Sequence, residues 1–175
     1  MKKYMILCLM SVTSMVAIAQ TSEHPESKLA AKGYTLPASS KPIANYVKYV
    51  IDGNKLYLSG HGACGDPTPV DRGKLGKDLT IPQGYEAARN VGLCILATVK
   101  DALGDLGRVK RVIKVLGMVN CTPDFTDQPK VMNGFSDLMV EVFGEKGKHV
   151  RSAVGMNSLP NGMTVEIEVL LEIEN

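Results

Sequence analysis

The last segment of the chain constrains the fold more than any other, because its side chains alternate between apolar and polar from Met163 to Ile173. The apolar set is Val165, Ile167, Val169, Leu171 and Ile173, and the polar set is Thr164, Glu166, Glu168, Glu172 and Glu174. This alternation predicts a β-strand with one buried face and one polar face. Such a strand belongs to a sheet whose apolar face is covered by other elements.

The remaining periodic segments predict those elements. They are a hairpin over Tyr46–Ser59 that turns at Asp52-Gly53, a helix over Pro82–Leu103, a strand over Arg108–Asn120, a helix over Asp127–Phe143 and a short strand over Val150–Asn157. The predicted order is β-β-α-β-α-β-β, an α+β fold with both helices on one face of the sheet.

The second face of this sheet has no element to cover it. Its expected residues include an apolar set, namely Val50, Val112, Leu116, Met118 and Leu170. An uncovered apolar face of this size favours self-association of the chain. The pattern does not give the number of subunits.

The first nineteen residues have the layout of a secretory signal peptide. Lys2 and Lys3 are followed by an apolar or small stretch from Tyr4 to Ile18, and Ala17-Ile18-Ala19 supplies the small-x-small cleavage pattern. The apolar stretch is too short for a membrane-spanning helix. We therefore expect residues 1–19 to be removed, residues 20–43 to form an N-terminal extension and residues 44–175 to form the domain. The mature chain would be periplasmic or secreted, without a membrane segment.

The charge balance argues against a nucleic-acid partner. The chain has 20 Lys plus Arg and 18 Asp plus Glu, and loss of Lys2 and Lys3 leaves 18 of each. Proteins that bind nucleic acids usually have an excess of positive charge that displaces counterions from phosphates. The basic set Arg108, Lys110, Arg111 and Lys114 is therefore interpreted as a solvated or paired face.

Three cysteines remain after processing, and an odd number does not complete a disulfide framework. Cys94 lies in an amphipathic helical stretch and is expected to be a small buried apolar residue. Cys64 and Cys121 lie beside loops and could pair in an oxidising compartment, so both states stay open for them.

Arg151 is the first candidate for a functional residue. It begins the small, apolar strand Ser152-Ala153-Val154-Gly155, where a solvated charge has little reason to be. A planar guanidinium beside backbone amides suits a carboxylate ligand, because it donates two parallel hydrogen bonds. The alternative is a salt bridge to a carboxylate of the chain such as Glu166.

Two further candidates have simpler alternatives. Glu166 could be a general base, but it belongs to a row of glutamates that is typical of a solvated or inter-subunit face. His61 and Cys64 could bind zinc, but no second pair accompanies them, so we predict no metal site. The chain has no Gly-x-Ser-x-Gly, phosphate-loop or dinucleotide motif, and no cofactor is predicted.

The C-terminal block, Arg151-Ser-Ala-Val-Gly-Met-Asn-Ser-Leu-Pro-Asn-Gly-Met-Thr-Val-Glu166-Ile-Glu168, resembles the signature of the Rid (YjgF) family. The likeness extends upstream through Asn45-Tyr46-Val47, Gly53-Asn54, Leu58-Ser59-Gly60 and Asn133, and so covers most of residues 44–175. It implies a chorismate-mutase-like fold, a homotrimer around a central sheet barrel and a pocket in each inter-subunit cleft.

The resemblance also implies roles for individual residues. In deaminases of this family, the arginine that matches Arg151 binds the carboxylate of a 2-imino or enamine acid. The residues that match Glu166 and Tyr46 act on the attacking water, so both are the expected catalytic residues. The expected substrate contacts are Arg151, Asn133, the backbone near Ala153, and His61, which replaces the usual glutamine.

The implied reaction adds water to a C=N bond and releases ammonia and a 2-oxo acid. Two other functions remain as alternatives. One is a trimer that binds small carboxylates without turnover, because of the changes around His61. The other is a protein-binding role for the trimer surface.

Overall fold

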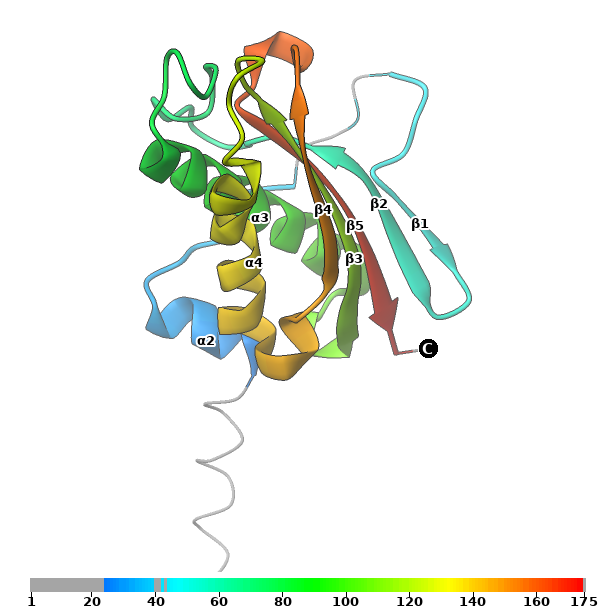
Figure 1. The fold of residues 1–175 in the computed structure, drawn as a ribbon. Helices are drawn as coiled ribbons and strands as arrows, with labels where there is room; N and C mark the ends of the chain where they lie inside the picture. Colours follow the sequence, from blue (N-terminus) through cyan, green and yellow to red (C-terminus); the bar gives the residue numbers. More distant parts are fainter. Residues whose placement is uncertain (1–23, 40–41, 43, 175) are drawn as a thin grey trace, which may run out of the picture.

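A computed structural model describes residues 24–39, 42 and 44–174. In this part of the chain, five strands form one sheet, and the two long helices lie side by side on one of its faces (Figure 1). This arrangement confirms the predicted α+β fold and its β-β-α-β-α-β-β order. No helix in the described residues has the length and apolarity needed to span a membrane. The predicted signal peptide, residues 1–19, lies outside the described residues.

The sheet has the strand order β1-β2-β5-β3-β4, so β1 and β4 form its two edges. The strands are β1 Tyr49–Asp52, β2 Lys55–His61, β3 Val109–Asn120, β4 Val150–Met156 and β5 Val165–Ile173. The β3–β4 pair is parallel, and the other pairs are antiparallel. The long crossover between β3 and β4 contains a helix, as a parallel pair requires.

The helices are α2 Pro25–Ala31, α3 Ile81–Leu103 and α4 Gln128–Phe143, with short 3-10 turns η1 Leu106–Arg108, η2 Gly144–Gly147 and η3 Pro160–Gly162. Helix α3 begins at a capping box between Thr80 and Gln83, which satisfies free N–H groups of the first turn. It ends at Gly104, whose φ of 76° is readily adopted by glycine. The sequence predicted both ends of this helix to within one residue.

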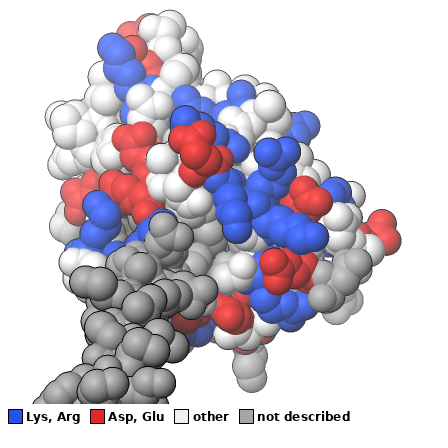
Figure 2. Space-filling model, turned by 90° about the horizontal axis from the view of Figure 1, so that it is seen from below, with Lys and Arg blue, Asp and Glu red and all other residues white. Residues whose placement is uncertain are grey.

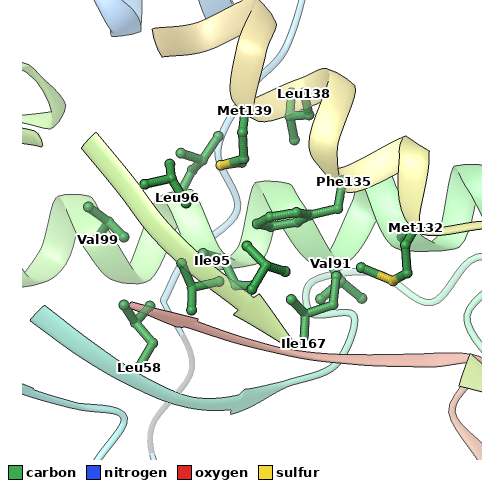
Figure 3. Close-up of a cluster of buried hydrophobic side chains, with 14 of the residues drawn as sticks. Leu58, Val91, Ile95, Leu96, Val99, Met132, Phe135, Leu138, Met139 and Ile167 are labelled. Atoms are coloured by element: carbon green, nitrogen blue, oxygen red, sulfur yellow. The ribbon is translucent and has the colours of Figure 1, made fainter. Parts of the chain in front are cut away.

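The core lies between the sheet and the pair α3 and α4 (Figure 3). Phe135 from α4 points toward Val91 and Ile95 from α3, and Ile167 of the sheet lies beyond Val91. The predicted apolar face of β5 is confirmed, because all five of its residues are buried.

The sequence predicts the wrong side of the sheet for Val112, near the start of β3. Val112 is predicted on the uncovered face, but only 1% of its surface is exposed, whereas the next residue, Ile113, is half-buried. The β3–β5 pairing shifts between Val109 and Arg111 and again between Val112 and Lys114. A bulge inserts an extra residue and reverses the alternation, which a period-two pattern cannot register.

The other face of the sheet carries the predicted uncovered apolar residues apart from Val112. One row across it follows the pairings Val50–Tyr57, Tyr57–Leu170, Leu170–Lys114 and Lys114–Val150. The edge residue Val150 is 67% exposed, and Val50 and Tyr57 are exposed as well. We call this side of the sheet the open face.

The β1–β2 hairpin is present, but its turn lies one residue later than predicted. Asp52 pairs with Lys55, so the loop consists of Gly53 and Asn54 instead of Asp52 and Gly53. Gly53 has a φ of 56° and Asn54 does not have a positive φ, which is the pattern of a turn that needs glycine at its first position.

Part of the predicted N-terminal extension packs against the domain. Leu29 of α2 is buried in the main core, and Arg89 of α3 donates a hydrogen bond of 2.7 Å to the Tyr34 hydroxyl. The Arg89 guanidinium also lies 5.0 Å from the centre of the Tyr34 ring, within the range of a cation–π contact. Residues 25–34 therefore cover the outer side of the helix layer.

The disulfide is between Cys64 and Cys94, with a Cα–Cα distance of 5.9 Å. Cys94 is buried, as expected, but it is bonded to Cys64 and is therefore not a simple apolar core residue. The Cys64–Cys121 pair that the sequence left open is not formed, because Cys121 is free and buried. The bond joins the irregular loop after β2 to α3. Sequence spacing does not define which cysteines meet, because it does not show which side of a helix a loop crosses.

We predict that this bond stabilises the domain. The cysteines are 30 residues apart, and closing a loop of that length removes about 3–4 kcal/mol of unfolded-state entropy. The double variant Cys64→Ser/Cys94→Ser should lose about that much unfolding free energy in urea titrations, and a reductant should then have no further effect on it. Reaction of Cys64 and Cys94 with iodoacetamide in the unfolded, unreduced wild type would contradict the pairing.

Candidate functional site

Arg151 is the second residue of the edge strand β4, and its side chain reaches α4. Its Nη1 donates to Ser136 Oγ at 2.8 Å and to Asn133 Oδ1 at 3.2 Å, and its Nη2 donates to the Pro129 carbonyl at 3.2 Å. All three acceptors are neutral oxygens of α4. We call this group, Arg151 with Asn133 and Ser136, the arginine edge.

The Arg151 guanidinium has no counter-ion among the described residues. No carboxylate oxygen there lies within 4.0 Å of it, so the alternative of a salt bridge to Glu166 is not formed within the chain. Burial lowers the pKa of Arg151, although the charge of Asp137 acts in the opposite direction. The three bonds leave the Nε–H and one Nη2–H without a described partner. These free donors can bind a carboxylate.

Two residues that the sequence analysis missed support the arginine edge. Ser136 Oγ lies 3.1 Å from His149 Nε2, and His149 Nδ1 lies 2.7 Å from the Gly147 carbonyl oxygen. Ser136 follows Asn133 by three residues on one side of α4, and His149 precedes Arg151 by two residues, so spacing alone could have grouped them. Burial lowers the pKa of His149 first, and the charge of Arg151 lowers it further.

Glu166 lies on the open face, opposite Met118 of β3. Its carboxylate packs over Gly60, where a Cβ atom would lie 2.1 Å from Glu166 Oε1, so a larger residue at 60 would displace it. Burial raises the pKa of Glu166, and the neighbouring charge of Glu168 raises it further. A carboxyl group with a raised pKa exchanges protons more readily near neutral pH.

His61 is on the opposite side of β2, in the core, with 5% of its surface exposed. Its Nδ1 lies 2.7 Å from the Ser59 carbonyl oxygen and its Nε2 lies 3.0 Å from Thr98 Oγ1. Burial is the main cause that lowers the pKa of His61. Both ring nitrogens are therefore occupied within the chain, and Cys64 is bonded to Cys94, which removes the alternative zinc pair.

The structure brings only some of the predicted site residues together. Arg151 and Asn133 are in contact, and Ala153 follows on the same side of β4, partly packed on the core. Tyr46 precedes β1 with half of its surface exposed. Three strands lie between the edges β1 and β4. The two edges are therefore four strand spacings apart, which is roughly 19 Å at about 4.8 Å per spacing. Tyr46 therefore lies far from Arg151 within one chain. Glu166 is also separated from Arg151, because Glu166 lies on the open face and the Arg151 side chain turns to α4.

Other charged groups on the surface have partners or face solvent. The ligand atoms of His24, Glu26 and Asp105 lie within 4.8 Å of one another, but His24 pairs with Asp105 and Glu26 pairs with Lys100, each at 3.1 Å. On the face shown in Figure 2, lysine and arginine side chains gather beside one another with acidic side chains among them. Lys110, Arg111 and Lys114 are exposed, as predicted for a solvated face. Arg108 instead donates to the Leu103 and Glu174 carbonyls.

Residues 26–171 match the profile of a family described as "YjgF/chorismate_mutase-like, putative endoribonuclease". The chain belongs to this family. It is 46% identical to protein TCP17 of Trypanosoma cruzi over 144 residues, which are 82% of this chain and 90% of that protein. The YjgF-like fold and the resemblance of the C-terminal block are thereby confirmed.

Two solved structures of this fold are similar along most of their length. Atu1372 of Agrobacterium tumefaciens, a protein of unknown function, is 41% identical with a TM-score of 0.81, over 91% of this chain and 99% of that one. A "putative endoribonuclease" of Shewanella oneidensis is 33% identical with a TM-score of 0.82, over 86% of this chain and 99% of that one.

We predict that acidification destabilises this YjgF-family domain through its buried histidines. The pKa values of His61 and His149 lie below the ordinary value of 6.5, so the unfolded state binds more protons as the pH falls through 6.5. The unfolding free energy should therefore fall with pH below about 6.5. Glu166, whose pKa is raised, contributes with the opposite sign above its ordinary value of 4.5.

Urea titrations at a fixed protein concentration can isolate the histidine contribution. The loss between pH 7 and pH 5 should be smaller in His61→Gln than in the wild type, because glutamine can replace the hydrogen bonds but does not titrate. An equal loss in both proteins would contradict the assignment.

Proposed function

We propose that the mature protein hydrolyses small 2-imino or enamine acids to 2-oxo acids and ammonia, in clefts between the subunits of a homotrimer. The observation that supports this most is the half-buried Arg151 guanidinium, which among the described residues has only neutral partners and keeps two N–H donors unpaired. Membership of the YjgF family agrees with a deaminase-like or small-molecule-binding role.

The proposed cleft requires two copies of the chain. Arg151 lies at one edge of the sheet and turns to α4, whereas Glu166 lies on the open face and Tyr46 precedes the opposite edge strand. The exposed apolar residues of the open face, Val50, Tyr57 and Val150, favour association of the copies. In the proposed trimer, one subunit supplies the arginine edge, and its neighbour supplies Glu166 and Tyr46.

The residues then divide the reaction between them. Arg151 binds the substrate carboxylate through its free N–H groups, and Asn133 fixes the guanidinium. Glu166 takes a proton from water as the oxygen attacks the imine carbon, and passes it to the nitrogen as the C=N electron pair moves there. Glu166 then takes the proton of the new hydroxyl group and gives it to the amine as the C–N bond breaks. Ammonia leaves with the C–N electron pair, and the deprotonated oxygen becomes the carbonyl of the 2-oxo acid. No cofactor is needed.

Export is part of the proposal. Disulfides persist in oxidising compartments such as the periplasm or the cell exterior, and Cys64–Cys94 is such a bond. The Cys64–Cys94 disulfide agrees with export of the protein by a signal peptide over residues 1–19.

The alternative is a trimer that binds small carboxylates without turnover. The position of His61 favours it, because the ring lies in the core and both of its nitrogens are occupied. In that case, carboxylates would raise the melting temperature while imines would not be hydrolysed.

We predict that Glu166→Gln and Arg151→Ala impair different steps. With imines generated in situ by an amino-acid oxidase, Glu166→Gln should lower kcat about 100-fold or more, because the proton-transfer group is lost. Arg151→Ala should lower kcat/KM by about 100-fold, because the carboxylate loses charge-assisted hydrogen bonds. Lys77→Ala, an exposed surface change, is the control. Ammonia release by the wild type no faster than in buffer would reject the enzyme.

We also predict that the two inactive variants complement each other. If every site uses Arg151 from one chain and Glu166 from another, randomly mixed trimers of Arg151→Ala and Glu166→Gln contain about one quarter intact sites. Co-expression should therefore restore about a quarter of the wild-type activity. Activity no higher than that of the single variants, in trimers shown by mass spectrometry to be mixed, would place both residues in one chain's site.

A further inference from the structure

His149 and Ser136 form a hydrogen-bond chain that ends on Arg151. A carbonyl oxygen only accepts, so His149 Nδ1 carries the proton that it shares with the Gly147 carbonyl at 2.7 Å. In a neutral ring, Nε2 is then the acceptor, and it receives the Ser136 hydroxyl proton at 3.1 Å. The Ser136 oxygen in turn accepts from Arg151 Nη1 at 2.8 Å. In a neutral His149 ring, each hydrogen bond of this series therefore has a defined donor and a defined acceptor.

We propose that His149 is a positioning residue, which orients Arg151 through Ser136 and makes carboxylate binding depend on its own neutral state. This inference rests on the proposed carboxylate site at Arg151. It adds a residue and a pH response to that site.

The orientation follows from the number of bonds. Both Nη1 hydrogens are held by α4, one by Ser136 and one by Asn133, and Nη2 donates to the Pro129 carbonyl. The guanidinium is planar, so these bonds fix the direction in which the Nε–H and the remaining Nη2–H point. A carboxylate meets a prepared pair of donors and does not have to order the side chain first.

Protonation of His149 disturbs this arrangement in two ways. Nε2 becomes a donor, so the Ser136 hydroxyl proton must turn away, and its oxygen must accept from both His149 and Arg151. A positive charge also arises close to the guanidinium, because the Ser136 hydroxyl bonds to both the His149 ring and Arg151 Nη1. Both changes weaken the hydrogen bond between Arg151 Nη1 and Ser136.

The charged groups around His149 have partners of their own or face solvent. The Phe135 ring packs against it edge-on, with centroids 5.9 Å apart. Glu145 of η2 forms an exposed ion pair at 2.7 Å with Lys148, the residue that follows η2. From α4, Asp137 acts on Arg151, and it accepts from the Tyr85 hydroxyl at 2.9 Å. From β3, Lys114 pairs with Val150 and is exposed.

The test is the affinity for pyruvate, measured by isothermal titration calorimetry from pH 8 to pH 5. The wild type should bind about tenfold more weakly at pH 5, the size of effect that follows from loss of one hydrogen bond to a charged group. His149→Gln keeps an acceptor for Ser136 but does not titrate. It should recover most of the affinity that His149→Phe loses at pH 8, and its affinity should stay within about twofold over the range.

The controls separate this effect from others. Ser136→Ala should bind weakly at both pH values, because the connection to Arg151 is cut. His24→Gln should retain the wild-type pH profile, since His24 pairs with Asp105 instead. Titration of Glu166 affects the wild type and His149→Gln alike, so the comparison cancels it. Melting temperatures show whether each variant is folded.

Each outcome decides a separate question. A pH profile of His149→Gln that matches the wild type, or full affinity in His149→Phe, overturns the role of His149 and leaves the carboxylate site intact. If the folded wild type binds no pyruvate at pH 8, the site itself fails, and with it the inference.

Discussion

The proposed site depends on a charge that is half removed from water and has no carboxylate oxygen within 4.0 Å among the described residues. The guanidinium of Arg151 is held by the oxygens of Ser136, Asn133 and Pro129, all neutral. A buried salt bridge would have neutralised the charge but also closed the site, because the carboxylate would occupy the donors that a ligand needs. Neutral acceptors fix the side chain and leave its charge available. The edge position of β4 gives this charge access to whatever covers the edge.

The second constraint is the one-sided covering of the sheet. Because α3 and α4 cover one face, alternate residues of each strand point to the core or to the open face. Glu166 falls on the open face and Arg151 turns to the helices, so their separation follows from strand parity and strand order. Under the proposed function, a single chain would therefore hold two partial sites. Self-association, for which the apolar open face provides the driving force, is also what would complete the proposed chemistry.

Local sequence patterns predict much of this fold. Strand β5 is predictable from its alternation, because burial of one face imposes a period of two. Helix α3 is predictable because the residues at its two ends are typical of a helix start and a helix end. Two of the errors concern contacts between segments that are distant in the sequence. The bulges in β3 arise from pairing with β5, and the partner of Cys64 depends on how a loop crosses α3. Arg151 could be singled out by its apolar neighbours. Spacing places Ser136 beside Asn133 and His149 beside Arg151, but only the packing of α4 against β4 joins these two pairs.

A crystal structure of the mature protein soaked with pyruvate tests the central claim most directly. The account predicts a carboxylate with its oxygens about 2.8–3.0 Å from Arg151 Nε and Nη2. It further predicts that Glu166 of a neighbouring subunit lines the same cleft. Pyruvate bound elsewhere, or a cleft lined by a single chain in a monomeric protein, would contradict the account.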